Sequence, residues 1–155
     1  MFKENKSKEK NCLFFISDYH FEMITLPYIN KNIKDDKNVI VVSENNLEDT
    51  MNKVISRVNL EKEEKEKILE IDWKNNDLNK FKEIKQANQD KKDTIIFIKG
   101  KENYIQNINK NIENWIDQEN VKIIDCYDIN EVQDCVDEIA QKYDNVLVTS
   151  GMKKL

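Results

Sequence analysis

Cys12-Leu-Phe-Phe-Ile16 is an uninterrupted apolar run that breaks at Ser17-Asp18, and it decides the fold class of this chain. A short, continuous apolar run with polar residues on either side is typical of a strand that is buried on both faces. We therefore predict that residues 12–16 form the first strand of a covered sheet.

Similar apolar runs recur along the rest of the chain. They predict strands at Val39–Val42, Ile68–Ile71, Thr94–Ile98, Val121–Ile124 and Val146–Val148. Between most of these runs, apolar residues return at helical spacing, most clearly over residues 104–116, where Trp115 is expected in the core. A repeat of strand and helix predicts an α/β three-layer sandwich, Rossmann-like or RecA-like, with a mainly parallel sheet of about six strands.

Several helices are predicted from their apolar stripes. Pro27 is tolerated only in the first turn of a helix, so the first helix should begin near Met23 or Thr25. The charged residues 61–67 predict an exposed helical turn or loop. Two further stripes predict a helix through Leu78, Phe81 and Ile84 and a single last helix through Ile129, Val132, Val136, Ile139 and Ala140.

Composition narrows the domain organisation and the class of partner. A chain of 155 residues fits one domain, with 1–10 as a flexible tail and 11–155 as the folded part. The net charge is −5 and Arg57 is the only arginine, which argues against direct nucleic-acid binding. No apolar run approaches the roughly 18 to 20 residues that span a membrane, and three cysteines without close pairing suggest free thiols in the cytoplasm.

The loop after the first strand lacks the residues of a phosphate-binding loop. Gly100 and Gly151 are the only glycines, so neither a Walker A loop nor a dinucleotide-binding glycine motif can be present. The loop contains Asp18 and Glu22, which would repel a phosphate. We predict no cofactor and no metal site.

Ligands of open parallel sheets bind beyond the carboxyl ends of the strands. Polar and aromatic residues follow each predicted strand, including Ser43, Asn45, Lys99 and Asp125. From these positions we predict a ligand pocket lined by Asp18, Tyr19, His20, Glu44, Trp73, Tyr127 and Asp128.

Other interpretations of these residues remain open. His20 beside Asp18 could act as a general base in a hydrolase or transferase, although a histidine that is hydrogen-bonded at a helix start is the simpler interpretation. Trp73 and Tyr127 could stack on a ligand or plug the end of the sheet. Asp18, Asp72 and Lys99 superficially match the carboxylates and lysine of a phosphoryl-accepting receiver domain, but the spacing fits poorly.

Parts of the chain resemble the MEDS domain, the methanogen and methylotroph DcmR sensory domain. The resemblance lies in Asn11-Cys-Leu-Phe-Phe15, Val39-Ile-Val-Val-Ser43, Ile123-Ile-Asp-Cys-Tyr-Asp128 and Asn145-Val-Leu-Val-Thr-Ser-Gly151. It implies a RecA-like sheet that has lost its phosphate loop and serves as a sensory input. The chain departs from that family in having Asn11 near the first strand where relatives often have a histidine.

Together these patterns predict a stand-alone ligand-sensing regulatory domain rather than an enzyme. We expect it to bind an unidentified small molecule and to signal through a regulatory protein partner, such as a kinase or a transcription regulator. We also expect it to be able to form a homodimer. The alternative from another class is a protein-interaction scaffold whose strand edge is closed by its own side chains.

Overall fold

The computed structural model describes residues 9–114 and 120–155 and shows an α/β fold. Six strands form one sheet in the order β2-β3-β4-β1-β5-β6. All neighbouring strands are parallel except the last pair, β5 and β6. The strands are β1 (Asn11–Phe15), β2 (Asn38–Ser43), β3 (Thr94–Gly100), β4 (Val121–Asp128), β5 (Asn145–Val148) and β6 (Gly151–Lys154).

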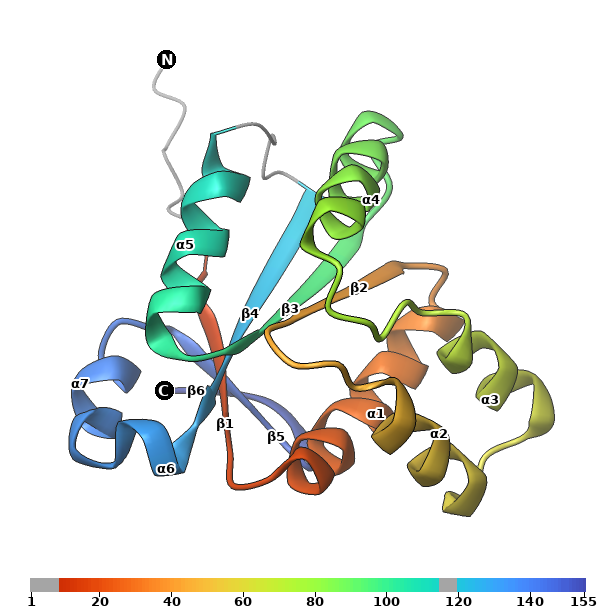
Figure 1. The fold of residues 1–155 in the computed structure, drawn as a ribbon, viewed down its shortest axis with the longest axis horizontal. Helices are drawn as coiled ribbons and strands as arrows, with labels where there is room; N and C mark the ends of the chain where they lie inside the picture. The colour runs from red at the N-terminus through yellow and green to blue at the C-terminus, as the bar shows by residue number, and fades with distance from the viewer. Residues whose placement is uncertain (1–8, 115–119) are drawn as a thin grey trace.

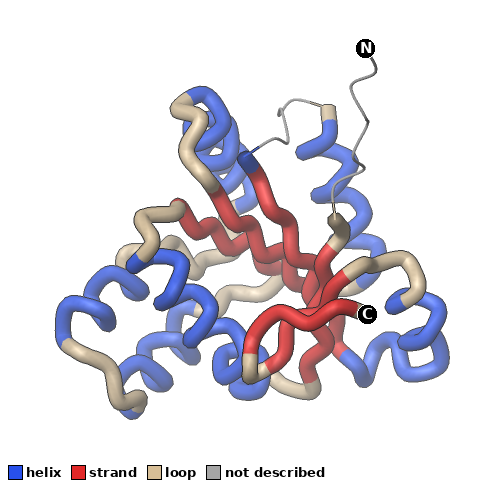
Figure 2. The backbone as a smooth tube through the Cα atoms, turned by 180° about the vertical axis from the view of Figure 1, so that it is seen from behind, coloured by secondary structure: helices blue, strands red, loops and turns tan. Residues whose placement is uncertain are grey.

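Helices cover both faces of the sheet, as Figures 1 and 2 show. One face packs against α1 (Asp18–Lys34), α2 (Glu48–Arg57) and α3 (Lys62–Leu69). The other packs against α4 (Asp77–Gln89), α5 (Glu102–Glu113) and the short helices α6 (Ile129–Val132) and α7 (Val136–Ala140). Side chains alternate between the two cores along each central strand because successive residues of a strand point to opposite faces. The predicted three-layer, mainly parallel architecture is therefore confirmed.

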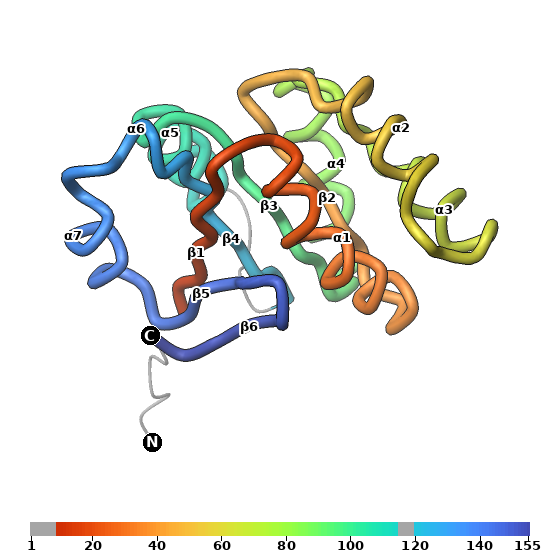
Figure 3. Tube along the Cα trace, turned by 90° about the horizontal axis from the view of Figure 1, so that it is seen from below, coloured from red at the N-terminus to blue at the C-terminus, as the bar shows by residue number. Residues whose placement is uncertain are grey.

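The connections place a switch point between β1 and β4, which are hydrogen-bonded neighbours. The chain leaves β1 through α1 on one face and leaves β4 through α6 and α7 on the other. Figure 3 shows α1, α2 and α3 towards one end of the molecule and α6 and α7 towards the other. Open α/β sheets bind ligands near such a switch point, at the carboxyl ends of the strands.

Helix α1 begins earlier than predicted. It starts at Asp18, after Ser17, whose side chain accepts a hydrogen bond from the His20 amide at 3.1 Å, so Pro27 lies in the helix interior. A proline cannot donate to the carbonyl four residues before it, which is that of Met23. Both Pro27 and Met23 are exposed, so solvent can hydrate that carbonyl. The predicted start near Met23 or Thr25 was wrong because it ignored this exposure.

The predicted strand Ile68–Ile71 is also absent. Residues 62–69 form helix α3, which begins with a capping box in which Glu61 and Glu64 satisfy each other's backbone amides. Ile68 is the buried residue through which this charged helix packs on the core, and Glu64 holds it to α1 through Asn30 and Lys34. An apolar run of four residues does not distinguish a strand from a helix end.

Three elements near the carboxyl end of the chain differ from prediction. Strand β4 continues four residues beyond Ile124 because Asp125 is buried and hydrogen-bonded, not a polar stop. The single last helix is divided into α6, a 3₁₀ turn at Gln133–Cys135 and α7. Strand β6, which was not predicted, follows a two-residue turn at Thr149-Ser150 and pairs with β5, with Gly151 at φ +115°, a conformation that favours glycine.

Some predictions can be compared only in part. Trp115 and Ile116 of the predicted stripe, and residues 1–8 of the predicted tail, lie outside the described residues. In helix α4, Ile84 is buried as predicted, but Leu78 is exposed and its place on the stripe was wrong; Lys80 and Ala87 complete the buried face. Within residues 9–114 and 120–155, no helix has the length and apolar character needed to cross a membrane.

Candidate functional site

A polar cluster lies at the carboxyl edge of the sheet, where β1, β2 and β3 end. The ammonium group of Lys99 is 2.9 Å from Oδ1 of Asp18, and it donates to Oδ1 of Asn45 at 2.9 Å. Asn45 in turn donates to Asp18 at 3.3 Å and accepts from the hydroxyl of Ser43 at 2.9 Å. The cluster joins the start of α1 to the ends of β2 and β3.

Lys99 is buried because of its place on β3. It follows Ile95 and Phe97 on the face that packs against α1, and its side chain is only 5% exposed. Its Nζ lies 4.7 Å from the centre of the Phe15 ring and 5.5 Å from that of Phe21, which adds a cation–π attraction. A buried cation of this kind needs a carboxylate, and Asp18 provides it.

Glu22, one turn after Asp18, is a buried carboxyl without a hydrogen bond. It is 1% exposed, and within the described part of the chain neither of its oxygens accepts a hydrogen bond. Burial is the main cause that raises its pKa, with Asp18 acting in the same direction and Thr50 and Lys99 in the opposite one. Thr50 therefore lies close to Glu22, but the hydrogen bond that its hydroxyl donates goes to the Leu47 carbonyl, at 3.1 Å.

A groove of about 580 Å³ between α1 and α2 contains Glu22 in its lining. From α1 come Tyr19 and Met23, which are exposed. The remaining lining residues belong to α2 and the segment that follows it: Thr50, Lys53, Val54, Arg57, Val58 and Asn59. An unpaired buried carboxylate thus lies beside a cavity with apolar walls and two exposed cations, which is the composition of a binding site.

The predicted lining residues that follow β1 and β2 lie at this edge. Asp18 belongs to the Lys99 cluster and Tyr19 lines the groove. His20 is engaged with the backbone of its own turn, since its Nδ1 accepts from the Ile16 amide at 2.9 Å. Glu44 accepts from the Lys101 amide at 2.9 Å, beside Gly100, where an added Cβ would lie 2.9 Å from the Glu44 carboxylate.

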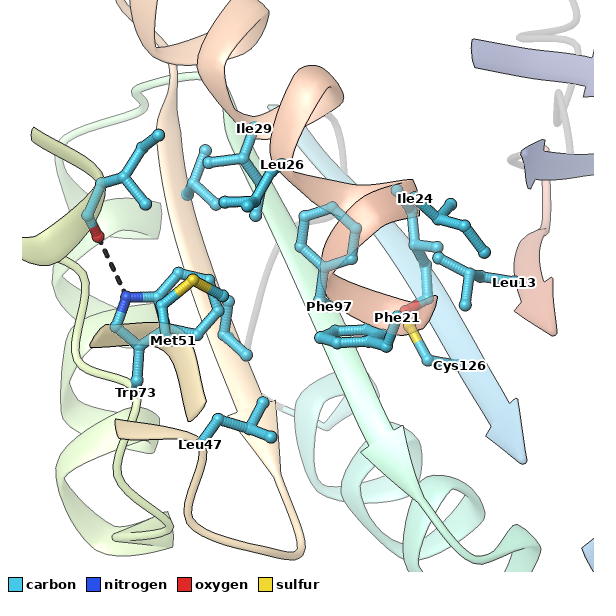
Figure 4. Close-up of a cluster of buried hydrophobic side chains, with 14 of the residues drawn as sticks. Leu13, Phe21, Ile24, Leu26, Ile29, Leu47, Met51, Trp73, Phe97 and Cys126 are labelled. Atoms are coloured by element: carbon cyan, nitrogen blue, oxygen red, sulfur yellow. Dashed lines mark hydrogen bonds between the residues drawn. The ribbon is translucent and has the colours of Figure 1, made fainter. Parts of the chain in front are cut away.

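The other three predicted residues do not join them. Trp73 is buried in the core between α2 and α3, where its indole donates to the Ile68 carbonyl at 3.0 Å (Figure 4). Asp128 accepts from the Asn130 amide and caps α6. Tyr127 lies inside β4 on the opposite face of the sheet, away from α1 and α2. Trp73 is therefore a core residue in this structure.

Tyr127 instead belongs to a second polar network, under α5. Its hydroxyl is 2.5 Å from that of Tyr143, which donates to Asp125 at 2.6 Å, and Asn109 donates to the other Asp125 oxygen at 2.9 Å. Burial raises the pKa of Asp125, and the two donors partly offset this. The network borders a cavity of about 490 Å³ on this face. Both oxygens of the Asp125 carboxylate therefore accept hydrogen bonds from within the network, from Tyr143 and from Asn109.

No known protein family, curated protein or solved structure matches this chain. The features that bear on function are therefore those of its own residues. Asp72, the third residue of the receiver-like set, lies next to Lys80, whose ammonium contacts its carbonyl and lies 3.6 Å from its carboxylate. It thus has a partner other than Lys99. Within the described ranges, no group of three or more acidic, histidine or cysteine side chains could hold a metal ion.

The predicted lining left out Lys99 and Glu22, although the sequence places Lys99 at the end of a strand and Glu22 shortly after the first strand. The alternation of Ile95, Phe97 and Lys99 places the lysine on a covered face, and a lysine there demands a nearby acid. Glu22 follows Phe21 and precedes Ile24 on an apolar face, which indicates burial. That it would lack a donor depends on how α1 packs on α2 and cannot be deduced from spacing.

Proposed function

We propose that the chain is a ligand-sensing regulatory domain and that its small-molecule site is the groove between α1 and α2. The observation that carries this proposal is Glu22, a buried carboxyl in the lining of the groove that no donor in the described residues satisfies. A protein rarely keeps an unsatisfied buried polar group, and each one calls for an explanation. A ligand that supplies the missing donor is such an explanation.

The surroundings of the groove support a role in signalling. The Asp18–Lys99–Asn45 cluster connects the start of α1 to β3 and to the loop before α2. A ligand that moves α1 relative to α2 would disturb this cluster, and the change would reach the outer surface of both helices. We propose that a regulatory protein partner, a kinase or a transcription regulator, binds there, in the cytoplasm. The resemblance to the MEDS domain is consistent with this role.

A scaffold without a ligand is the second candidate. It is favoured by the closure of the edge over β2 and β3, where Ser43 and Lys99 are buried under the chain's own polar contacts. In that case the outer helices alone would bind a partner, and the groove would stay empty.

A thermal-shift screen tests the proposal. Nucleotides, second messengers and small apolar or zwitterionic molecules are screened against the wild type, because a ligand of the native state raises the melting temperature. The Met23→Trp variant fills the groove with an indole, while Leu78→Trp makes a similar change at an exposed site on α4. We expect stabilising compounds to act on the wild type and on Leu78→Trp only. A compound that stabilises Met23→Trp equally well does not bind in the groove, and if all do, the proposed site is wrong.

A further inference from the structure

We propose that the groove between α1 and α2 binds a short apolar peptide of two or three residues, with its ammonium group on Glu22 and its carboxylate on Lys53 and Arg57. This inference rests on the proposed function, because it uses the same groove, and it names the chemical class of the ligand.

The floor of the groove requires a donor. Both oxygens of Glu22 expose less than 1 Å² and accept no hydrogen bond from the described residues. Lys99 is the cation whose charge acts on Glu22, but its ammonium is already engaged by Asp18 and Asn45. A primary ammonium group offers three donors and one positive charge, so it could satisfy both Glu22 oxygens.

The rim of the groove has the opposite charge. Thr50, Lys53, Val54 and Arg57 line it at the spacing that places residues on one face of a helix. Lys53 and Arg57 are exposed, and neither makes an ion pair within 4.0 Å of a described acidic group. Arg57 can hold a carboxylate with two parallel hydrogen bonds.

The charges select the class of ligand. A simple cation would be attracted by Glu22 but repelled by Lys53 and Arg57 at the rim. A simple anion would bind at the rim but would leave Glu22 without a donor. A zwitterion satisfies both ends, and the apolar side chains of Met23, Val54 and Val58 favour apolar groups between its charges.

The length of the groove sets the size of the ligand. Thr50, which lies close to Glu22, and Arg57 are seven residues apart on α2, which corresponds to about 10 Å along a helix. An extended peptide covers about 3.3 to 3.6 Å per residue, so two or three residues fit this span. Tyr19 and Met23, which line the same groove, are exposed, so their side chains can move as the ligand's ammonium group approaches Glu22.

Calorimetric titration with the dipeptide Leu-Ala tests this proposal directly. Two blocked forms serve as matched probes: N-acetyl-Leu-Ala lacks the ammonium group, and Leu-Ala amide lacks the carboxylate. We expect Leu-Ala to bind and each blocked form to bind at least tenfold more weakly. Absence of Leu-Ala binding, or equal binding of all three probes, would overturn the proposal.

Two pairs of variants locate the binding. Glu22→Gln and Arg57→Ala should each weaken Leu-Ala binding at least tenfold. Asp49→Asn on α2 and Lys62→Ala on α3 remove exposed charges that do not line the groove, and they should bind as the wild type does. Circular dichroism verifies that all four variants are folded. If the control variants lose as much affinity as Glu22→Gln and Arg57→Ala, the assigned contacts are wrong.

The two proposals can fail separately. If the screen finds a stabilising compound that Met23→Trp no longer binds, while Leu-Ala does not bind, the groove is a ligand site but the peptide assignment is wrong. If Leu-Ala binds equally to the wild type and to Met23→Trp, the groove itself is not the site, and both proposals fail.

Discussion

At the scale of single residues, the candidate site contains three charged groups, of which Asp18 and Lys99 are paired and Glu22 is not. Asp18 and Lys99 form a salt bridge of 2.9 Å, and Asn45 contacts both of them. Glu22 lies within electrostatic reach of the pair but receives no hydrogen bond from the described residues. The site therefore combines a satisfied ion pair with an unsatisfied acid, and the two should respond differently to substitution.

Glu22→Gln should make the protein more stable near neutral pH. The raised pKa of Glu22 means that the folded state holds this proton more tightly than the unfolded state does. The contribution of Glu22 to the free energy of unfolding is therefore fully present below the unfolded pKa of about 4.3, and it is lost as the pH rises through the folded pKa. Glutamine removes the buried charge, so we expect a gain of about 1 kcal/mol at pH 7 and almost none at pH 3.5. Urea unfolding at both pH values measures this difference.

The control for this change is Asp49→Asn, which neutralises an exposed acid on α2. It should alter the free energy of unfolding by no more than about 0.5 kcal/mol at either pH. A Glu22→Gln variant that is less stable than the wild type at pH 7 would show that the carboxylate has a donor in the folded protein.

Asp18 and Lys99 should differ in the cost of their removal. Asp18→Ala leaves a buried ammonium without its carboxylate, at a cost of about 3 kcal/mol. Lys99→Met replaces that ammonium with an apolar group against the rings of Phe15 and Phe21, and it should cost about 1 kcal/mol or less. Chemical denaturation of both variants and of the double variant measures the costs and the coupling. Equal costs would argue that Lys99 is well hydrated without Asp18.

At the scale of elements, the helices and strands differ in how far sequence predicts them. Strands β1, β2, β3 and β5 follow from dense apolar runs, and α2 follows from a stripe that starts at Leu47. The missed elements depend on contacts far away in the sequence. Strand β4 continues through Asp125 because Tyr143 and Asn109 satisfy it, and α1 contains Pro27 because that turn faces solvent. No local pattern contains this information.

Tyr143→Phe should destabilise the end of β4. The hydroxyl of Tyr143 donates to the buried Asp125 carboxylate, and phenylalanine leaves that oxygen without its donor. The expected cost is about 1 to 3 kcal/mol. Guanidinium unfolding measures it, and Tyr104→Phe, which removes a tyrosine hydroxyl that bonds Asp77 at a half-buried site, is the comparison. The Tyr104 change should cost less, and a reversed order would contradict the importance assigned to the network under α5.

At the scale of the whole molecule, two hydrophobic cores share one sheet, and each central strand contributes to both. The α/β class and the mainly parallel sheet were predictable because strands that are apolar throughout require cover on both faces. The composition of the candidate site was only partly predictable. Residues that follow strands do gather at one edge, but Tyr127 and Trp73 were misplaced because the ends of their elements were not where the apolar runs suggested.

The shared sheet predicts that the protein unfolds in a single transition. In a Trp115→Phe background, Trp73 is the only fluorophore of its kind and reports on the α2–α3 side, while far-ultraviolet circular dichroism reports on all helices. The two transitions in urea should coincide, as they do for a two-state domain. Two separate midpoints would show that the parts on the two faces of the sheet unfold independently.

The hairpin of β5 and β6 has a consequence for behaviour at high concentration. The outer strand of a sheet presents unpaired backbone groups that can recruit the same strand from another copy and begin a fibril. Strand β6 is short and ends in the exposed residues Lys153 and Lys154. Two such strands would bring four ammonium groups together, and this repulsion opposes amyloid growth from that side of the molecule.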